Sequence, residues 1–253
     1  MPSRSKRVTN LILTAAWNPK IFQSPSILED RRKRLVTSLR HYVDSRLFSC
    51  ISLLDSTIDE EAAASLTKIN PDLIYVPTVV THPEGEFSGP SYLEALLYVA
   101  ARERIFESNR PDDHTFKITG GYVVRNIETI VERYHSAQLD ALGFLHQNPL
   151  RMSSRYAMTS CMAMSNVHWH KFIGGLQSTL DQLRTSPLES AYCHFLSRIE
   201  SERGPSMPYP RLEARFSTGG QTSASLPYRL REIMWRMYSR TGLYVLSHRD
   251  ASA

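Results

Sequence analysis

Apolar positions in the first half of the chain alternate between two patterns, one typical of buried strands and the other of amphipathic helices. Short apolar runs such as Val8–Ala15 (VTNLILTA) indicate strands, and apolar residues three and four apart, such as Leu35 and Leu39, indicate helices. Strand and helix patterns follow one another in turn, which predicts an α/β fold with a Rossmann-like, mostly parallel sheet flanked by helices. The expected strands cover residues 8–15, 48–54, 72–77 and 115–118, and the expected helices cover residues 26–44, 57–66 and 91–108.

The second half of the chain is less regular. Residues 156–167 (YAMTSCMAMSNV) fit either a strand or a buried helix, whereas residues 187–200 and 227–240 are expected to be helical. The proline-rich stretch Gly204–Pro210 is the candidate boundary. We therefore expect a main domain over residues 1–203 and a C-terminal segment, residues 204–253, whose basic amphipathic helix packs on the same domain.

The composition is that of an ordinary globular protein with a moderate excess of positive charge. Its 253 residues carry a formal net charge of +5. The apolar stretch behind the basic N-terminus is too short for a membrane span and lacks a cleavage region, so export is not expected. Cys50, Cys161 and Cys193 are odd in number and scattered, which favours reduced thiols in the cytoplasm over disulfides. Because no nucleic-acid-binding signature accompanies the basic residues, we expect no nucleic-acid partner and interpret Arg31–Arg34 as a solvated helix face.

The most informative motif lies where the strand at 115–118 ends. The strand continues into Thr119-Gly120-Gly121-Tyr122, and the helical spacing of Val123, Ile127 and Ile130 predicts a helix directly behind it. Two glycines at such a turn let the backbone approach a ligand closely, and the amides of a helix N-terminus favour an anion. The alternative is a tight turn that needs a positive φ at one glycine.

Acidic residues at the ends of predicted elements are further candidates, because ligands of open α/β sheets bind beyond the carboxyl ends of the strands. Asp55 closes the second strand, and Glu94 and Glu189 lie in the first turns of their helices. For both glutamates the alternative is a favourable interaction with the helix dipole. If Glu189 faces a cleft, it can accept a proton from a sugar hydroxyl.

Other catalytic and metal-binding motifs are missing from the sequence. The chain has no Walker-type phosphate loop, no G-x-G-x-x-G fingerprint and no G-x-S-x-G elbow. His168-Trp169-His170 has metal-ligand residue types, but no further ligand follows at suitable spacing, so we interpret the two histidines as a structural pair.

Several blocks of the chain resemble a group of bacterial glycosyltransferases associated with capsule and surface-polysaccharide biosynthesis. These blocks are NLILTAAWNP, GPSYLEALL, FKITGGYVVRNI, LESAYCHFL and PRLEARFSTGG, and they extend from about Asn10 to Gly220. In the family pattern K-I-T-G precedes Arg-Tyr, whereas this chain has Gly121-Tyr122, so no role of that arginine is carried over.

The resemblance implies a GT-A-like fold with a less regular C-terminal acceptor region, and a transferase that moves a sugar from a nucleotide-sugar donor to a glycan or lipid-linked acceptor. Many such enzymes hold the diphosphate through a metal on an Asp-x-Asp motif, and the corresponding stretch here contains no carboxylate. We therefore expect donor binding without a metal cofactor, through backbone amides and basic side chains, with a divalent metal as the alternative.

The residues expected to form the site fall into three groups. Glu189 is the expected catalytic base. The expected donor-binding residues are Thr14, Ala16, Asn18, Asp55, Glu94, Lys117, Thr119, Gly120, Gly121, Tyr122 and Asn126, and the expected acceptor or phosphate residues are Ser217, Gly219 and Gly220.

Two other functions remain open from the sequence: a different nucleotide-binding α/β enzyme, and a non-catalytic glycan- or membrane-associated binding protein. The expected location is the cytoplasm. The last helix carries Leu230 and Ile233 beside arginines, which fits contact with the anionic inner leaflet of a membrane. The alternative for this helix is packing on the domain with a solvated basic face.

Overall fold

Strands and helices alternate along the first half of the protein. The computed structural model describes residues 8–17, 24–77, 90–106, 110, 112–146, 156–199, 202–203, 207–213, 230, 233 and 245–248. The first elements are β1 (Thr9–Thr14), α1 (Pro25–Ser45), β2 (Cys50–Asp55), α2 (Glu60–Thr67), β3 (Ile74–Pro77), α3 (Pro90–Phe106) and β4 (His114–Thr119). The expected alternation of strands and helices is confirmed.

The second half contributes shorter strands and further helices. These elements are β5 (Val123–Val124), α4 (Ile127–Ser136), β6 (Ala141–His146), β7 (Tyr156–Ala157), β8 (Cys161–Ser165), α5 (Asn166–Ser178), the 3₁₀ helix η1 (Leu180–Arg184), α6 (Leu188–Arg198), β9 (Glu202–Arg203), β10 (Leu212–Glu213) and β11 (Val245–His248).

One mixed sheet forms the centre of the molecule, in the order β3-β2-β1-β4-β8-β6-β11-β9. Strands β3, β2, β1 and β4 are parallel, and β8 lies antiparallel between β4 and β6. β11 joins β6 antiparallel, so the C-terminal segment adds a strand to the main sheet. The expected Rossmann-like sheet flanked by helices is confirmed by the parallel strands β3, β2, β1 and β4, and the later strands add antiparallel pairs to it.

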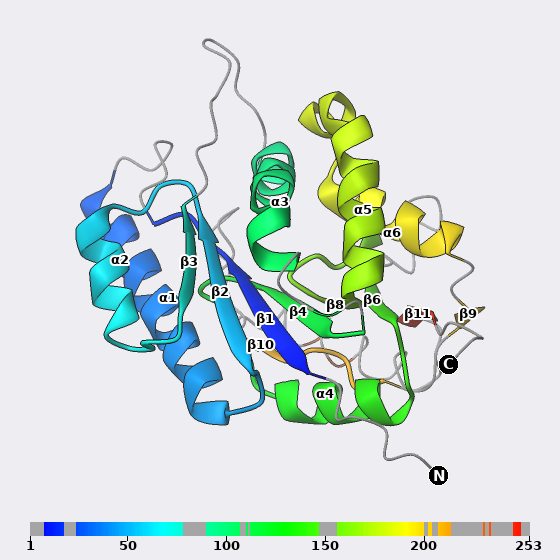
Figure 1. Ribbon diagram of the computed structural model, residues 1–253, viewed down its shortest axis with the longest axis horizontal. Helices are drawn as coiled ribbons and strands as arrows, with labels where there is room; N and C mark the ends of the chain where they lie inside the picture. The colour runs from blue at the N-terminus through cyan, green and yellow to red at the C-terminus, as the bar shows by residue number, and fades with distance from the viewer. Residues whose placement is uncertain are drawn as a thin grey trace.

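Helices cover both faces of this sheet (Figure 1). Successive residues of β1 face opposite sides, so Leu11 and Leu13 pack against α1, α2 and α4 while Ile12 packs against α3, α5 and α6. α3 and α5 lie side by side on the second face. The buried aromatic rings of Tyr98 and Trp169 connect these two helices, with ring centroids 5.6 Å apart.

Two local predictions differ from the structure. The helix expected directly behind Thr119–Tyr122 begins only at Ile127, because Val123–Val124 pairs with Leu212–Glu213 as a short antiparallel ribbon. The helix expected from Thr57 begins at Glu60, because Asp59 caps it by accepting the Ala62 amide at 2.7 Å.

For two further segments, the structure decides what the sequence pattern left open. Residues 156–167 form β7 and β8 and then enter α5 at Asn166. Of the last expected helix, Leu230 and Ile233 are described, both helical and with exposed fractions of 56% and 52%. Within the described ranges, no helix combines the length and the apolar character needed to cross a bilayer.

Candidate functional site

The carboxyl ends of β1, β2 and β4 bring several of the predicted residues to one edge of the sheet. Thr14 of β1 is in register with Thr119 of β4 and with Leu54 of β2, next to Asp55. The chain leaves β1 through Ala15 and Ala16, and the Ala15 amide still donates to the Leu54 carbonyl at 3.0 Å. Residues distant in sequence therefore meet where open α/β sheets commonly bind ligands.

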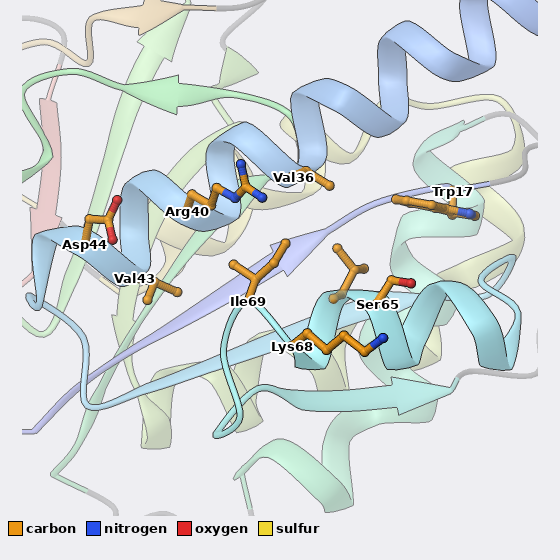
Figure 2. A pocket seen from close by; sticks show the side chains of 9 residues that line it. Trp17, Val36, Arg40, Val43, Asp44, Ser65, Lys68 and Ile69 are labelled. Carbon is orange, nitrogen blue, oxygen red and sulfur yellow. The ribbon is translucent and has the colours of Figure 1, made fainter.

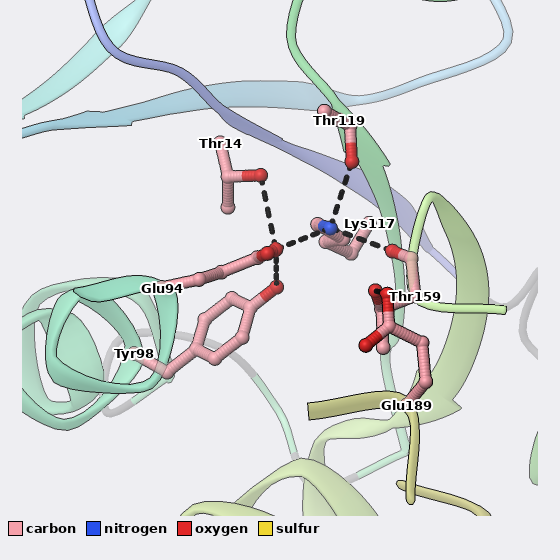
Figure 3. A network of polar contacts seen from close by, with 7 residues as sticks. All are labelled: Thr14, Glu94, Tyr98, Lys117, Thr119, Thr159 and Glu189. Atoms are coloured by element: carbon pink, nitrogen blue, oxygen red, sulfur yellow. Dashed lines mark hydrogen bonds and ion pairs between the residues drawn. The ribbon is translucent and has the colours of Figure 1, made fainter. Parts of the chain in front are cut away.

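A network of polar side chains lies at this edge (Figure 3). Lys117 of β4 is completely buried, and its ammonium forms an ion pair with Glu94 of α3. The Lys117 Nζ also donates to the Thr119 hydroxyl at 3.1 Å and to the Thr159 carbonyl at 2.6 Å. Lys117 is among the residues expected to bind the donor, but its side chain is buried and its three partners connect β4 to α3 and to the turn before β8.

The two carboxylates of the network have different surroundings. Glu94 Oε1 accepts hydrogen bonds from Tyr98 at 2.7 Å and from Thr14 at 3.2 Å, in addition to the Lys117 ammonium. Glu189, in the first turn of α6, accepts a single bond from the Thr159 hydroxyl at 3.3 Å among the described residues. Figure 3 shows Glu94 on one side of Lys117 and Glu189 on the other. Glu94 is held by several donors, and Glu189 keeps more of its acceptor capacity.

Tyr122 lies between positive and negative groups at the same edge. Burial raises the pKa of its hydroxyl; Arg34 and Arg31 lower this pKa, and Glu94 and Glu189 raise it. All four charged side chains are therefore within electrostatic reach of one phenol. The backbone of Tyr122 is fixed by the Tyr42 hydroxyl, which donates to its carbonyl at 2.9 Å. The edge thus has a cationic side, contributed by α1, and an anionic side, contributed by α3 and α6.

The cationic side shows that Arg31–Arg34 is more than a solvated helix face. Lys33 is exposed, but Arg31, Arg32 and Arg34 are half-buried. Arg32 places its guanidinium 5.1 Å from the ring centroid of Trp17, in the segment that leaves β1. Burial and the neighbouring Arg34 lower the pKa of Arg31, while Tyr122 and Asp55 raise it.

Gly120 and Gly121 form a tight turn packed on α1. The Gly120 amide donates to the Thr14 carbonyl at 2.6 Å, and the Gly121 amide donates to the Ser38 hydroxyl at 3.1 Å. Gly121 has a φ of 83°, which L side chains rarely adopt. Both amides already donate to protein acceptors, so the geometry does not favour the expected phosphate binding by these amides. It favours the other interpretation of the motif, a tight turn that requires a positive φ at Gly121.

Asp55 is completely buried and connects the ends of β1 and β2. Its Oδ2 accepts the Trp17 amide at 2.7 Å, and its Oδ1 accepts the amide and the hydroxyl of Thr57, each at 2.7 Å. Burial raises the pKa of this carboxyl, and the bonds from Thr57 and Trp17 and the charge of Arg31 oppose that rise. In this arrangement Asp55 shapes the edge and does not present its oxygens to a ligand.

Asn126, another of the predicted residues, lies away from the network. Its side chain donates to the Tyr209 carbonyl at 3.0 Å and accepts a hydrogen bond from the Arg211 amide at 2.7 Å. Ala16 is half-buried at the edge. The predicted residues Asn18, Ser217, Gly219 and Gly220 lie outside the described residues.

The two histidines around Trp169 belong to α5, where they face different partners. His168 is buried and its Nδ1 lies 2.8 Å from the Ser165 hydroxyl, and His170 accepts a bond from Arg102 at 3.3 Å. Within the part of the chain that the structure describes, no three His, Cys, Asp or Glu side chains are grouped in a way that could hold a metal ion.

A separate surface groove runs between α1 and α2 (Figure 2). It has a volume of about 570 Å³ and an apolar floor that includes Val36, Val43 and Ile69. Trp17 lies at one end, and Arg40 and Asp44 lie toward the other. The groove contains none of the residues of the network in Figure 3.

Two residues of the network are not among the predicted ones: Tyr98, which donates to Glu94, and Thr159, which donates to Glu189. Tyr98 could have been found, since it lies four residues after Glu94 on the same helix and therefore on the same face. No sequence pattern around Thr159 predicts its role, because its position depends on how the turn before β8 packs against β4.

Solved structures with a similar course of the chain share little sequence with it. A 4-diphosphocytidyl-2C-methyl-D-erythritol synthase is 12% identical, with 72% of this chain and 87% of that chain covered and a TM-score of 0.40. The galactosyltransferase LgtC, solved with donor and acceptor sugar analogues, is 12% identical, with 72% and 69% covered and a TM-score of 0.47.

A third structure, the bifunctional glycosyltransferase WbbM, is 12% identical over 100% of this chain and 47% of that chain, with a TM-score of 0.43. At these values the likeness concerns the course of the chain alone, and the fold class rests on the strand order itself. No protein-family model matches the chain, and neither does any curated protein sequence.

Proposed function

We propose that this protein is a glycosyltransferase that moves a sugar from a nucleotide-sugar donor to a hydroxyl of a glycan or lipid-linked glycan, in surface-polysaccharide biosynthesis. The observation that supports it most is the unequal pair of carboxylates at the carboxyl edge of β1 and β4. Glu94 is fixed by Lys117, Tyr98 and Thr14, whereas Glu189 has one hydrogen-bond donor among the described residues. Such a pair can divide two tasks, holding a substrate and accepting a proton.

In this proposal Glu189 is the general base of an inverting transfer. The acceptor oxygen forms a bond to the anomeric carbon, its proton passes to Glu189, and the bond from that carbon to the diphosphate breaks with its electron pair. Thr159 holds Oε1 of Glu189 in place, which leaves Oε2 for the acceptor hydroxyl. Among the described residues, the hydrogen bonds and the ion pair of Glu94 are made by Oε1, so Oε2 can accept a bond from a hydroxyl of the donor sugar.

The charges around Tyr122 fit a substrate of this class. A nucleotide sugar carries its negative charge on the diphosphate and its hydroxyl groups on the sugar and the ribose. The cationic side formed by α1 suits the first part, and the carboxylates of α3 and α6 suit the second. Donor binding in this proposal uses basic side chains rather than a resident metal.

The first experiment is a thermal-shift panel of UDP, GDP, CMP and dTDP, each with and without manganese. One nucleotide should raise the melting temperature more than the others, because a ligand that binds only the folded state stabilises it. Hydrolysis of the matching nucleotide sugars then tests for turnover. If no nucleotide sugar is hydrolysed or transferred, a non-catalytic binding protein is favoured. If pyrophosphate is released from a nucleoside triphosphate and a sugar phosphate, a nucleotidyltransferase is favoured.

A membrane contact belongs to the same proposal, because a lipid-linked acceptor would be presented at the inner leaflet. Leu230 and Ile233 are three residues apart on a helix and are 56% and 52% exposed, which gives one apolar side for lipid. Flotation with anionic vesicles tests this. Binding should fall when both residues are replaced by serine, and recovery of the wild type with the unbound fraction at low salt would contradict it.

A further inference from the structure

The arginines of α1 meet the carboxyl edge of the sheet at one defined place. Arg31, Arg34 and Leu35 are three and four residues apart and therefore share a helix face. Leu35 contacts the turn, since a carbon added at Gly120 would lie 3.0 Å from its Cδ1. A carbon added at Gly121 would lie 3.6 Å from the Cβ of Arg34. Helix α1 thus packs on the Gly120–Gly121 turn through Arg34 and Leu35. Arg31 lies about one helical turn closer to the N-terminus of α1.

Arg31 and Arg34 lie three residues apart on this helix face, and both are half-buried. Asp55 ends β2 and Tyr122 follows β4, and both lie within electrostatic reach of Arg31. An arginine side chain carries a positive charge in proteins at neutral pH. Two like charges on one face of a helix repel each other, and an anion bound between them relieves that repulsion.

Arg34 has an acidic neighbour whose interaction an anion can replace. Its Nη2 lies 3.1 Å from Asp30 Oδ2, one turn earlier on α1, and the two side chains are 27% and 40% exposed. Partly exposed ion pairs between residues one helical turn apart contribute little to stability. Arg34 can therefore keep its position on the helix and turn its guanidinium toward a phosphate.

We propose that Arg31 and Arg34 form an anion site for a diphosphate group, with the Tyr122 side chain at its border. Each planar guanidinium can donate two parallel hydrogen bonds to one phosphoryl group, which a lysine cannot do. Two such groups one helical turn apart suit two adjacent phosphoryl groups better than a single carboxylate. The inference rests on the proposed function, since it names the residues that would hold the donor's diphosphate.

The test is calorimetric titration of the full chain with inorganic pyrophosphate and with UDP, GDP and dTDP at about 0.15 M salt, where distant surface charges are screened. In the double variant R31Q/R34Q, pyrophosphate affinity should fall by roughly 10-fold or more for each arginine, since charge-assisted bonds to phosphate are lost. R31K/R34K keeps both charges but cannot donate the paired hydrogen bonds of a planar guanidinium group. Its affinity for pyrophosphate should therefore lie between those of the wild type and R31Q/R34Q. This second variant also keeps the test decisive if R31Q/R34Q folds poorly.

The matched control is Arg40→Gln, which removes an exposed arginine of the same helix that lines the groove in Figure 2. Its pyrophosphate affinity should stay within about twofold of the wild type, since surface charges away from a site act weakly in the presence of salt. The inference is overturned if R31Q/R34Q binds pyrophosphate as the wild type does, if R40Q loses as much affinity as the double variant, or if the wild type binds no pyrophosphate.

Failure of this inference can be told apart from failure of the proposed function. Sugar transfer that survives in R31Q/R34Q upholds the function and overturns the anion site. Pyrophosphate binding that depends on both arginines, without turnover of any nucleotide sugar, upholds the anion site and overturns the function.

Discussion

Lys117 and Glu94 form an ion pair that joins β4 to α3, and the lysine side chain is completely buried while the glutamate is 23% exposed. The same ammonium donates to the Thr159 carbonyl, and Thr159 in turn donates to Glu189. One buried cation thus connects the two carboxylates to which the proposal gives different roles. Its contribution is geometric, because it fixes the turn before β8 relative to β4.

Replacement of Lys117 by methionine should destabilise the fold by about 3–5 kcal/mol, because it leaves Glu94 without its buried partner. Glu94→Gln should also destabilise it, since the buried lysine then loses its anionic partner. The double variant K117M/E94Q should be more stable than the sum of the single changes predicts, with a coupling of about 0.5–3 kcal/mol. Urea unfolding measures all four proteins, and strictly additive changes would show that the pair is not coupled.

Glu189→Gln should preserve the fold and nucleotide binding but remove transfer. The amide keeps an oxygen for Thr159, yet it cannot accept a proton, and loss of a general base lowers rates by about 10²–10⁴. The control is Glu213→Gln on β10, which breaks an exposed ion pair with Arg125 at 2.7 Å and should leave the rate within a few-fold. Transfer by E189Q at close to the wild-type rate would remove Glu189 from this role.

Much of the fold follows from local patterns, because each buried strand and each amphipathic helix shows its period in a short window. The helix behind the glycine turn was placed too early because Val123 and Ile127 have helical spacing. The pairing that makes Val123 a strand residue comes from Leu212–Glu213, far along the chain. No window of sequence contains both partners, so this correction required the structure.

The site was predictable only in part, for a similar reason. Glu94 and Glu189 could be selected because they follow breaks at the starts of helices. The partial burial of Arg31 could not be predicted, since it depends on which face of α1 packs on the sheet, and Leu35 makes that contact at Gly120. The partners of Lys117 could not be predicted either, because its buried ammonium contacts Thr159 and Glu94, which belong to other elements.

Gly120→Ala should destabilise the protein, although glycine-to-alanine changes often do the opposite. A Cβ at this position would lie 2.8 Å from the Thr14 carbonyl oxygen and 2.9 Å from the Cβ of Ala15, both part of the strand end. Because this neighbourhood contains backbone, overpacking should cost on the order of 1–3 kcal/mol. Thermal and urea unfolding measure the effect, and an unchanged melting temperature would mean that β1 and the turn can separate at little cost.

The opposite result is expected in the middle of α5. A Cβ at Gly174 or Gly175 would meet no atom within 4 Å, and both residues are helical and exposed. Alanine should therefore stabilise the protein by about 1 kcal/mol at each position through its higher helix propensity. The two changes serve as the control for Gly120→Ala, and a loss of stability at both would indicate that this helix face is covered in solution.

Asp55 accepts hydrogen bonds with both of its carboxylate oxygens. One oxygen accepts from the Trp17 amide, and the other accepts from the amide and the hydroxyl of Thr57. Asparagine offers only one oxygen, so an NH₂ group must face one of these donors. Asp55→Asn should cost about 1–3 kcal/mol, the penalty of a buried donor without an acceptor. Urea unfolding of the wild type and of the variant at neutral pH measures this cost.

The cost should also change with pH, in a direction set by the carboxyl group. Burial raises the pKa of Asp55 above its ordinary value of 3.8, so the folded state binds the proton more readily than the unfolded state. Its contribution therefore favours folding at low pH and is lost as the pH rises through the window between these two pKa values. Because the variant does not titrate there, the stability difference between wild type and D55N should be larger at about pH 4 than at about pH 7. A difference that shrinks on acidification would mean that the hydrogen bonds from Trp17 and Thr57 outweigh burial and lower the pKa of Asp55.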